Sequence, residues 1–408
     1  MNTAFITGPT GCIGSATCRW LLEHGIDRIV GFSRRRDLSR LDKTCHSHLE
    51  WIAGDVTDLD QLSKAIEQAQ PRQIIHLAAL QTPDCQAQPL VGMDVNVAGT
   101  MNLFRAAAEV SAPIDRVVFA SSAAVYGQRS LYPTDSVSAT AAYLPPNLYG
   151  YWKVAGEGIA QAFYQQTGIA TVSLRLATTY GPGRDQGLTS APTTAIKSAA
   201  LGTPYRMPYQ GREHYHFVDD VAAGFGQAAI LPFNGYGVFN LRGKTEEATT
   251  FLELVREVAG EFSFAADIAV ATDATSMPFV CDLDDNETLA AFPQMPRTDL
   301  REGIRRSLRL FKEQVASGDL RPDCSWDKTG HASTGPFYRP ITGSGHAAIQ
   351  TRVEASRDPG IVSIRQARPS SQMPQRAPRP CACSRQSSIR VRMISAINGC
   401  KPSGEVTR

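Results

Sequence analysis

A tyrosine and a lysine four residues apart, Tyr149 and Lys153, are the pair in this sequence best suited to proton transfer. At this spacing two helical residues share a face, so the ammonium group would lie beside the phenol. A free phenol has a pKa of about 10, and a neighbouring positive charge lowers that pKa by favouring the phenolate. Such a tyrosine can exchange a proton with an alcohol while hydride moves to or from a nicotinamide. Two rival phenols, Tyr143 and Tyr151, have no lysine four residues further on.

Two serines, Ser121 and Ser122, come before this tyrosine, directly after residues 116–120, of which 117–120 are apolar. That apolar run predicts a buried strand, so the serines would lie at its carboxyl end. A hydroxyl there can hydrogen-bond the reacting oxygen and hold it near Tyr149. The simpler interpretation is a serine-rich turn without a chemical role.

A glycine-rich turn opens the chain, between a predicted strand at residues 4–7 and a predicted helix at 15–22. Glycines in such a turn allow a tight bend, a close approach of a pyrophosphate and close packing of helix on strand. The free N–H groups and the dipole of the helix N-terminus would then face the phosphates. The alternative is an ordinary strand-to-helix turn. The residues expected to hold the coenzyme phosphates are Gly8, Gly11, Cys12, Ile13 and Gly14.

The end of the second predicted strand, residues 28–32, bears on the choice of coenzyme. Enzymes that use NAD usually present an Asp or Glu there to the ribose 2′-OH, whereas this chain has Ser33 followed by Arg34, Arg35 and Arg36. Arginine suits a 2′-phosphate because it donates two parallel hydrogen bonds. We therefore expect NADP slightly ahead of NAD, with Ser33 and Arg34 as contacts. The alternative is a solvated basic loop with NAD bound.

Alternating apolar strands and helices continue along the chain, which predicts parallel βαβ units. The strands are continuously apolar, as expected when both faces of a sheet are covered. The predicted fold class is α/β, a doubly wound parallel Rossmann sheet with a small C-terminal α/β substrate lobe. The expected strands are residues 4–7, 28–32, 48–53, 73–77, 116–120 and 169–175, and the expected helices are 15–22, 59–69, 91–110 and 149–168.

The regular alternation breaks after residue 180, and the character of the chain changes again near residue 321. We predict a dinucleotide-binding domain at residues 1–177, to which residues 212–235 return. The substrate lobe would comprise residues 178–211 and 236–320. Residues 321–408 are rich in Pro, Ser, Gly and Arg without periodicity, so we expect a disordered basic tail. Its alternative role is an arm that docks on an acidic partner or on nucleic acid.

Charge and composition restrict the function classes. Residues 1–320 contain 27 Lys and Arg against 34 Asp and Glu, a net charge of −7, whereas the tail has a net charge of +9. An acidic body does not favour nucleic-acid binding. There is no long apolar run and no paired metal-type cysteine motif, so we expect no membrane span, no metal and a cytoplasmic protein. Cys381 and Cys383 are interpreted as two exposed thiols.

These segments together resemble the extended short-chain dehydrogenase/reductase family, the NAD(P)-dependent sugar epimerases and dehydratases, over residues 1–320. The resemblance implies that Ser122, Tyr149 and Lys153 are catalytic, since alignment on Val-Tyr-Gly at 125–127 places the hydroxyl at Ser122. It also implies homodimers that pack through the helices around 91–110 and 149–167. The further coenzyme contacts that it implies are Asp55 and Val56 at the adenine, Leu77, Ala78 and Ala79 near the nicotinamide half, Asn96, Ser121, Tyr149 and Lys153.

Departures from the family pattern concern the substrate. Sugar dehydratases of the family carry an Asp-Glu pair directly after the catalytic hydroxyl, and this chain has two alanines there, which argues against a dehydratase. Thr178 replaces a usual Asn, and Glu213, beside Arg212, replaces an Arg that holds the sugar diphosphate. Because a glutamate there would repel a diphosphate, a sugar or sugar acid without a nucleotide fits the sequence as well. Thr178, Arg212 and His214 are the candidate substrate contacts.

The sequence therefore predicts an NAD(P)-dependent oxidoreductase or epimerase that acts on a hydroxyl of a sugar-like substrate. One alternative is a nucleotide-sugar 4-epimerase that retains its NAD. A second is a non-catalytic NAD(P)-binding regulator that senses the redox state of the coenzyme pool. An epimerase and a net dehydrogenase differ in coenzyme traffic, because only the dehydrogenase consumes its coenzyme.

Overall fold

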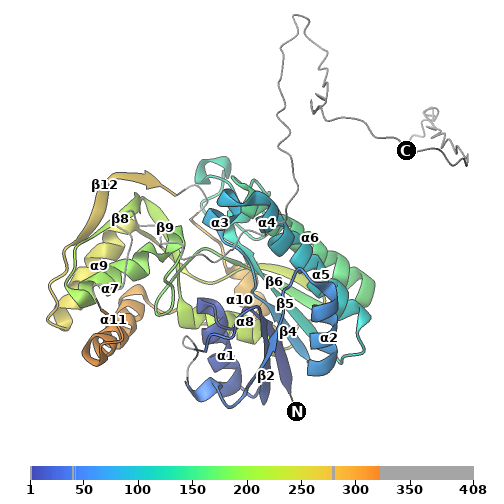
Figure 1. The fold of residues 1–408 in the computed structure, drawn as a ribbon. Coiled ribbons are helices and arrows are strands. Elements are labelled where there is room, and N and C mark those ends of the chain that lie inside the picture. The colour runs from blue at the N-terminus through green and yellow to red at the C-terminus, as the bar shows by residue number, and fades with distance from the viewer. Residues whose placement is uncertain (1, 39–40, 42, 278–280, 322–408) are drawn as a thin grey trace, which may run out of the picture. The chain divides into compact units, whose positions relative to one another are not determined.

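A seven-stranded parallel sheet forms the centre of the molecule in the computed structural model, which describes residues 2–38, 41, 43–277 and 281–321 (Figure 1). The strand order is β10-β6-β5-β4-β1-β2-β3. The direction of winding therefore reverses between β1 and β4, and ligands of such sheets bind beyond the carboxyl ends of the strands at that point. The strands are β1 (Thr3–Thr7), β2 (Arg28–Ser33), β3 (Leu49–Ala53), β4 (Gln73–His76), β5 (Arg116–Ser122), β6 (Ala170–Leu176) and β10 (Tyr236–Asn240).

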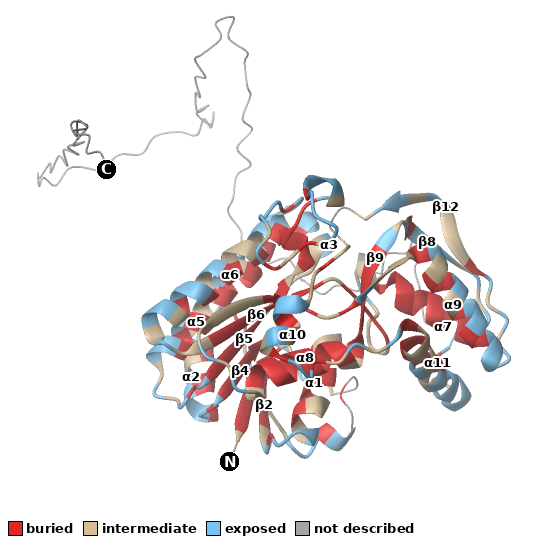
Figure 2. Ribbon diagram, turned by 180° about the vertical axis from the view of Figure 1, so that it is seen from behind, coloured by how far each residue is buried: buried red, intermediate tan, exposed pale blue. Residues whose placement is uncertain are grey.

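Helices cover both faces of this sheet. On one face α1 (Cys12–Glu23) packs beside α8 (Val218–Ile230), and their apolar side chains share a core with the strands. On the other face lie α2 (Leu59–Ala69), α5 (Gly99–Glu109) and α6 (Leu148–Thr167). Figure 2 shows the central strands buried and the outer surfaces of α2 and α5 exposed. The predicted doubly wound Rossmann fold is confirmed.

Local sequence explains where α2 and α6 begin and where α6 ends. The Asp58 carboxylate accepts the N–H of Gln61 at the start of α2, and the Asn147 side chain accepts the N–H of Gly150 at the start of α6. Such caps satisfy amides that have no partner within the helix. Gly168 ends α6 in the left-handed conformation with φ +73°, which a glycine adopts without strain.

A smaller lobe follows, built from three helices and two small sheets. Its helices are α7 (Ala191–Leu201), α9 (Ala248–Glu261) and α11 (Leu300–Ser317), which pack through a separate apolar core. One sheet pairs β8 (Tyr205–Gln210) with β12 (Ile268–Ser276). The other has the order β11-β9-β7, with β7 (Thr178–Tyr180), β9 (Arg212–Phe217) and β11 (Lys244–Glu247).

Three segments differ from the expected organisation. Residues 236–240 were expected in the lobe, but β10 pairs with β6 and forms the seventh strand of the central sheet. Of residues 212–235, only α8 packs on that sheet, because β9 pairs with β7 and β11 instead. The predicted helix 91–110 is divided into α4 (Pro89–Met93), a π-helical turn over Asp94–Ala98, and α5. The predictions for residues 322–408, Cys381 and Cys383 included, lie outside the described residues.

Candidate active site

The three predicted catalytic residues come together where β5 ends and α6 begins. Ser122 is the last residue of β5, and Tyr149 and Lys153 lie on the first two turns of α6. The Lys153 side chain is buried; its Nζ donates a 2.7 Å hydrogen bond to the carbonyl oxygen of Ala120 and lies 5.6 Å from the centre of the Tyr149 ring. The Ser122 hydroxyl accepts the N–H of Ala124 at 3.1 Å. The arrangement places a hydroxyl, a phenol and an ammonium group around one point.

The protonation of Tyr149 differs from the expectation based on its neighbour. Burial raises the pKa of Tyr149 to about 12, although a hydrogen bond with Ser122 and the charge of Arg184 act in the opposite direction. The expected lowering of this pKa by Lys153 is therefore wrong, because burial is the dominant cause and raises the pKa. The Lys153 amine is directed to a backbone carbonyl, and burial lowers its own pKa to about 8. Tyr149 is thus a protonated phenol at neutral pH.

The glycine turn fits a coenzyme pyrophosphate. Gly8 has φ +70°, and a Cβ atom at Gly14 would lie 2.2 Å from the Gly8 carbonyl oxygen, so the close packing of turn on helix excludes a side chain at position 14. Gly11 is the N-cap of α1, which has no side-chain cap and no acidic residue in its first turn. The amides at Cys12 and Ile13 follow directly. A helix N-terminus without an anion of its own is suited to bind phosphate.

The residues expected near the adenosine half lie at the carboxyl ends of β2 and β3. Ser33 is the last residue of β2, and its hydroxyl donates to the carbonyl oxygen of Arg35 at 3.1 Å. Arg34 is exposed. Asp55 follows β3, and one of its carboxylate oxygens accepts both the N–H and the hydroxyl of Thr57 at 3.0 and 2.9 Å. Val56 beside it is buried.

The loop expected under the nicotinamide half is held by β1. The Thr7 hydroxyl accepts the N–H groups of Leu77 and Ala78, each at 3.1 Å, so the chain turns at a defined place after β4. Ala79 follows in the same loop and is partly exposed. Asn96 was expected to contact the coenzyme, but its buried amide bonds both the N–H and the carbonyl oxygen of Leu80. Asn96 therefore shapes the loop.

A second loop, residues 181–190, lies against the glycine turn and against this β4 loop. The Cys12 thiol lies 3.9 Å from the carbonyl oxygen of Pro182, as a weak hydrogen-bond donor. Arg184 donates to the Gln81 side chain at 3.5 Å and to the Thr189 hydroxyl. Its buried Nε has no hydrogen-bond partner. The sequence offered no signal for Arg184 or Gln81, because both lie in irregular segments.

The three candidate substrate contacts have different surroundings. The Thr178 hydroxyl donates to the carboxylate of Glu213, and burial raises the pKa of Glu213 to about 8. His214 is buried; its Nδ1 pairs with the Thr245 hydroxyl at 2.9 Å, and its Nε2 has no partner. Arg212 does not join them, since its half-exposed guanidinium forms an ion pair with Asp282 at 2.8 Å.

His216, on the same strand, links the lobe to the central sheet. Its Nε2 accepts the N–H of Ala177 at 2.9 Å, directly after β6, and its Nδ1 donates to the carbonyl oxygen of Arg242 at 2.7 Å. Burial lowers the pKa of His216 to about 4, so the ring is neutral and can both donate and accept.

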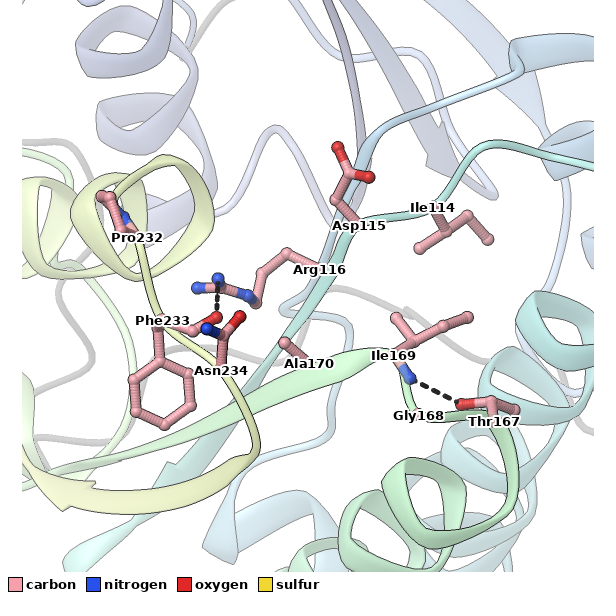
Figure 3. Close-up of a pocket in the computed structure, with 10 residues that line it drawn as sticks. All are labelled: Ile114, Asp115, Arg116, Thr167, Gly168, Ile169, Ala170, Pro232, Phe233 and Asn234. Carbon is pink, nitrogen blue, oxygen red and sulfur yellow. Dashed lines mark hydrogen bonds between the residues drawn. The ribbon is translucent and has the colours of Figure 1, made fainter.

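One hollow of about 450 Å³ lies at the amino ends of β5 and β6, the opposite edge of the sheet from Tyr149 (Figure 3). Arg116 reaches across it and donates to the carbonyl oxygens of Ala228 at 2.7 Å and Phe233 at 2.5 Å. These oxygens belong to the end of α8 and the residues after it, so Arg116 acts as a cap for that helix end. The hollow is not part of the candidate active site.

Two absences apply to the described part of the chain. No group of three His, Cys, Asp or Glu side chains there is placed to hold a metal ion. None of the helices found there combines the length and the apolar character that a membrane crossing needs.

The chain is similar in sequence and fold to several known proteins. UDP-glucuronate 4-epimerase 4 of Arabidopsis thaliana is 29% identical over 354 residues, which cover 78% of this chain and 77% of that protein. The solved structure of MoeE5 in complex with UDP-glucuronic acid and NAD has a TM-score of 0.64 at 25% identity and covers 77% of this chain and 100% of its own. UDP-glucuronic acid 4-epimerase of Bacillus cereus shares the fold, with a TM-score of 0.63 at 22% identity over 76% of this chain and 99% of its own. The model of the NAD dependent epimerase/dehydratase family matches residues 4–259, and the chain belongs to that family.

Proposed function

We propose that this protein is a nucleotide-sugar 4-epimerase that retains its nicotinamide coenzyme. The observation that carries the proposal is the convergence of Ser122, Tyr149 and Lys153 at the same edge of the sheet as a glycine turn that fits a pyrophosphate. The sequence alone favoured a sugar oxidoreductase with an exchanged coenzyme. The named relatives support the epimerase alternative better, because the Arabidopsis and Bacillus proteins are named as 4-epimerases and the two solved structures hold NAD.

Each residue has a defined task in this proposal. The bound coenzyme would supply the hydride acceptor and donor. As the phenolate, the Tyr149 oxygen takes the proton of the sugar hydroxyl, and it later returns this proton to the same sugar oxygen once the configuration at the carbon has changed. Ser122 orients the reacting oxygen through its hydroxyl. Lys153 provides a positive charge beside the phenol, which favours the phenolate once the site is occupied.

The position of Arg184 favours a substrate whose sugar carries an acidic group. Its charge reaches the Tyr149 phenol, and its buried Nε is without a partner in the described structure. A guanidinium in this position can bind a carboxylate or a phosphate close to the reacting hydroxyl. We therefore propose a uronic acid linked to a nucleotide as the first substrate to test, in agreement with the UDP-glucuronic acid bound by MoeE5.

The coenzyme pocket should accept a 2′-phosphate. The end of β2 carries Ser33 where a carboxylate would repel that group, and the exposed Arg34 follows. We propose that NADP binds at least as tightly as NAD. An epimerase that keeps its coenzyme does not depend on the ratio of the two pools, so either coenzyme is compatible with the reaction.

A homodimer is the proposed assembly. Large apolar side chains are exposed on neighbouring helices, with exposed fractions of 75% for Leu90 on α4, 49% for Met101 on α5 and 59% for Tyr151 on α6. A second copy of the same face would remove them from water. Light scattering after size exclusion should give twice the chain mass, and Met101→Lys with Tyr151→Lys should give monomers. A monomeric wild-type protein would contradict the assembly.

The proposed function is tested with purified protein and a panel of free and nucleotide-linked sugars. The expected result is release of NAD(P) from the denatured protein and interconversion of a nucleotide-linked uronic acid and its 4-epimer, observed by NMR. Absorbance at 340 nm should show no net change during turnover. Net coenzyme consumption would establish a dehydrogenase, and absence of coenzyme binding would contradict both.

A further inference from the structure

We propose that Glu157, held in place by Arg175, is a positioning residue for the active site: it joins α6 to the end of β5 and supplies the negative charge that faces Lys153. As a statement about catalysis this rests on the proposed function. As a statement about the charge of Lys153 it can be tested without a substrate.

Glu157 is a buried carboxylate that is completely surrounded by donors. Arg175 lies fully inside the molecule and donates from Nε and Nη2 to the two carboxylate oxygens, each at 2.8 Å. The hydroxyls of Ser121 and Tyr143 also donate to Glu157, the second at 2.8 Å. Four hydrogen bonds from a cation and two hydroxyls stabilise the ionised form. Arg175 and Glu157 therefore form an ion pair inside the protein.

The position of this anion relates it directly to the catalytic residues. Glu157 lies one helical turn after Lys153 on α6, so the two side chains share a face. Its partner Ser121 stands between Ala120, whose carbonyl oxygen accepts the Lys153 Nζ, and Ser122. The Glu157 contacts thus hold the last three residues of β5 against the helix that carries the lysine.

Arg175 extends the same network to the loop between β5 and α6. Its Nη1 donates to the Tyr126 hydroxyl and, at 2.7 Å, to the carbonyl oxygen of Ala139, and its Nη2 donates to Tyr143 at 3.0 Å. Because these contacts fix the loop that leads into α6, they also define where the helix begins and so where Tyr149 lies.

Charge balance gives Glu157 a specific role at Lys153. The ionisable groups that face this lysine are Tyr149 and Glu157 on α6, His76 on β4, and Cys85 on α3 (Thr82–Ala87). Burial lowers the pKa of His76 to about 3 and raises the pKa of Cys85 to about 11, so both are neutral at pH 7. Tyr149 is neutral as well. Glu157, the carboxylate of the buried ion pair with Arg175, opposes the loss of the proton from Lys153 that burial favours.

The test measures the protonation of Lys153 by NMR of protein with isotope-labelled lysine side chains across a series of pH values, because no reagent then has to reach the buried amine. Glu157→Gln should lower the titration midpoint of Lys153 by about one pH unit or more. Glu157→Asp, which keeps the charge, should restore most of the shift. The other lysines of each sample are internal controls, and Glu50→Gln, in the remote Arg28–Glu50 pair, is the matched control variant.

Activity supplies the second readout. Glu157→Gln should reduce kcat about 10-fold to 100-fold, because the catalytic groups lose their alignment, and should move the alkaline limb of the kcat profile to lower pH. Ser121→Ala, which removes one contact and no charge, should reduce kcat less without moving that limb. If Glu157→Gln disturbs folding, the Glu157→Asp and Ser121→Ala variants carry the comparison.

An unchanged titration midpoint in Glu157→Gln, or a midpoint that Glu157→Asp leaves shifted to the same extent, would overturn the proposal. If Glu157→Gln shifts the midpoint as expected but the wild-type protein has no epimerase activity, only the proposed function is contradicted.

Discussion

The coenzyme side of the site and its lobe side use their polar groups in opposite ways. On the proposed coenzyme side, α1 has no side-chain cap and no acidic residue in its first turn, so a bound ligand would meet the backbone itself. On the lobe side, Thr178 is bonded to Glu213, and His214 to Thr245. The comparison teaches that the coenzyme side presents backbone groups with few side chains, whereas the polar side chains of the lobe side are hydrogen-bonded to one another. Substitutions should accordingly affect coenzyme binding on one side and substrate selection or stability on the other.

The largest effect is expected for Tyr149→Phe, which should change the catalytic rate without changing the binding of coenzyme or substrate. Tyr149→Phe removes the proton carrier and should lower kcat by about 10²-fold to 10⁴-fold. The bound NAD(P) content should remain at the wild-type level, because the glycine turn is untouched. Tyr151→Phe, on the exposed face of the same helix, is the control and should retain activity. If Tyr151→Phe lost activity and Tyr149→Phe kept it, the assignment of the proton transfer to Tyr149 would be wrong.

Gly14→Ala tests the coenzyme side. The added Cβ atom would lie 2.2 Å from the Gly8 carbonyl oxygen, so the turn must shift, at a cost of about 1–3 kcal/mol. Coenzyme content and the melting temperature should both fall. Gly158→Ala is the matched control, since no atom lies within 4 Å of a Cβ there and alanine favours the helix by about 1 kcal/mol. An unaltered coenzyme content in Gly14→Ala would contradict the prediction that the glycine turn binds the coenzyme pyrophosphate.

Glu213→Gln tests the lobe side through the pH dependence of stability. The pKa of Glu213 rises from 4.5 to about 8 on folding. Its contribution to the free energy of unfolding is therefore complete below pH 4.5 and is lost as the pH rises to 8. The wild-type free energy of unfolding should therefore decrease over this interval, by at most about 1.4 kcal/mol per pH unit from this group. Glu213→Gln should remove that decrease in urea titrations at a series of pH values. Coenzyme affinity should not change.

His216→Asn tests the pH dependence of the free energy of unfolding in the opposite direction, because His216 stabilises the fold at high pH and Glu213 at low pH. The pKa of His216 falls from 6.5 to about 4 on folding, so its contribution is complete above pH 6.5 and is lost as the pH falls to 4. The variant should lose about 1–3 kcal/mol at pH 7, because the Ala177 N–H loses its acceptor, and should show less acid destabilisation. Acid destabilisation equal to that of the wild type would show that another group titrates there.

Ser33→Asp should have the smallest effect and tests coenzyme selectivity. A carboxylate at the end of β2 repels a 2′-phosphate and accepts a hydrogen bond from a 2′-OH. The ratio of dissociation constants for NADP and NAD should rise about tenfold or more, a difference of about 1.4 kcal/mol. Fluorescence titration of apo protein with each coenzyme measures it. If the wild type already prefers NAD strongly, the proposed 2′-phosphate site is wrong.

Sequence pattern was sufficient for the elements whose signals are local. The strands at 4–7, 28–32, 73–77 and 116–120 and the helix at 59–69 lie within two residues of their predicted bounds. Asp58 and Pro71, which flank that helix, are visible in the sequence. Tyr149 and Lys153 were found in the same way, because a four-residue spacing is a property of the helix itself.

Tertiary structure was required wherever distant residues meet. Glu157 could have been noticed as the fourth residue after Lys153, but Arg175 resembles an ordinary polar residue in an apolar strand until the two are placed together. β10 entered the central sheet because its partner β6 has an open edge, which a short apolar run does not reveal. Arg184 and Gln81 meet across 103 positions of irregular chain.

By itself the sequence determined the doubly wound sheet, the glycine turn and the spacing of the catalytic pair, because these follow from periodicity, backbone conformation and helix geometry over a few residues. Only the tertiary structure decided the charge state of those residues. Desolvation depends on every element packed around a group, and it reversed the expected direction of the Tyr149 pKa and made Glu213 a weak acid.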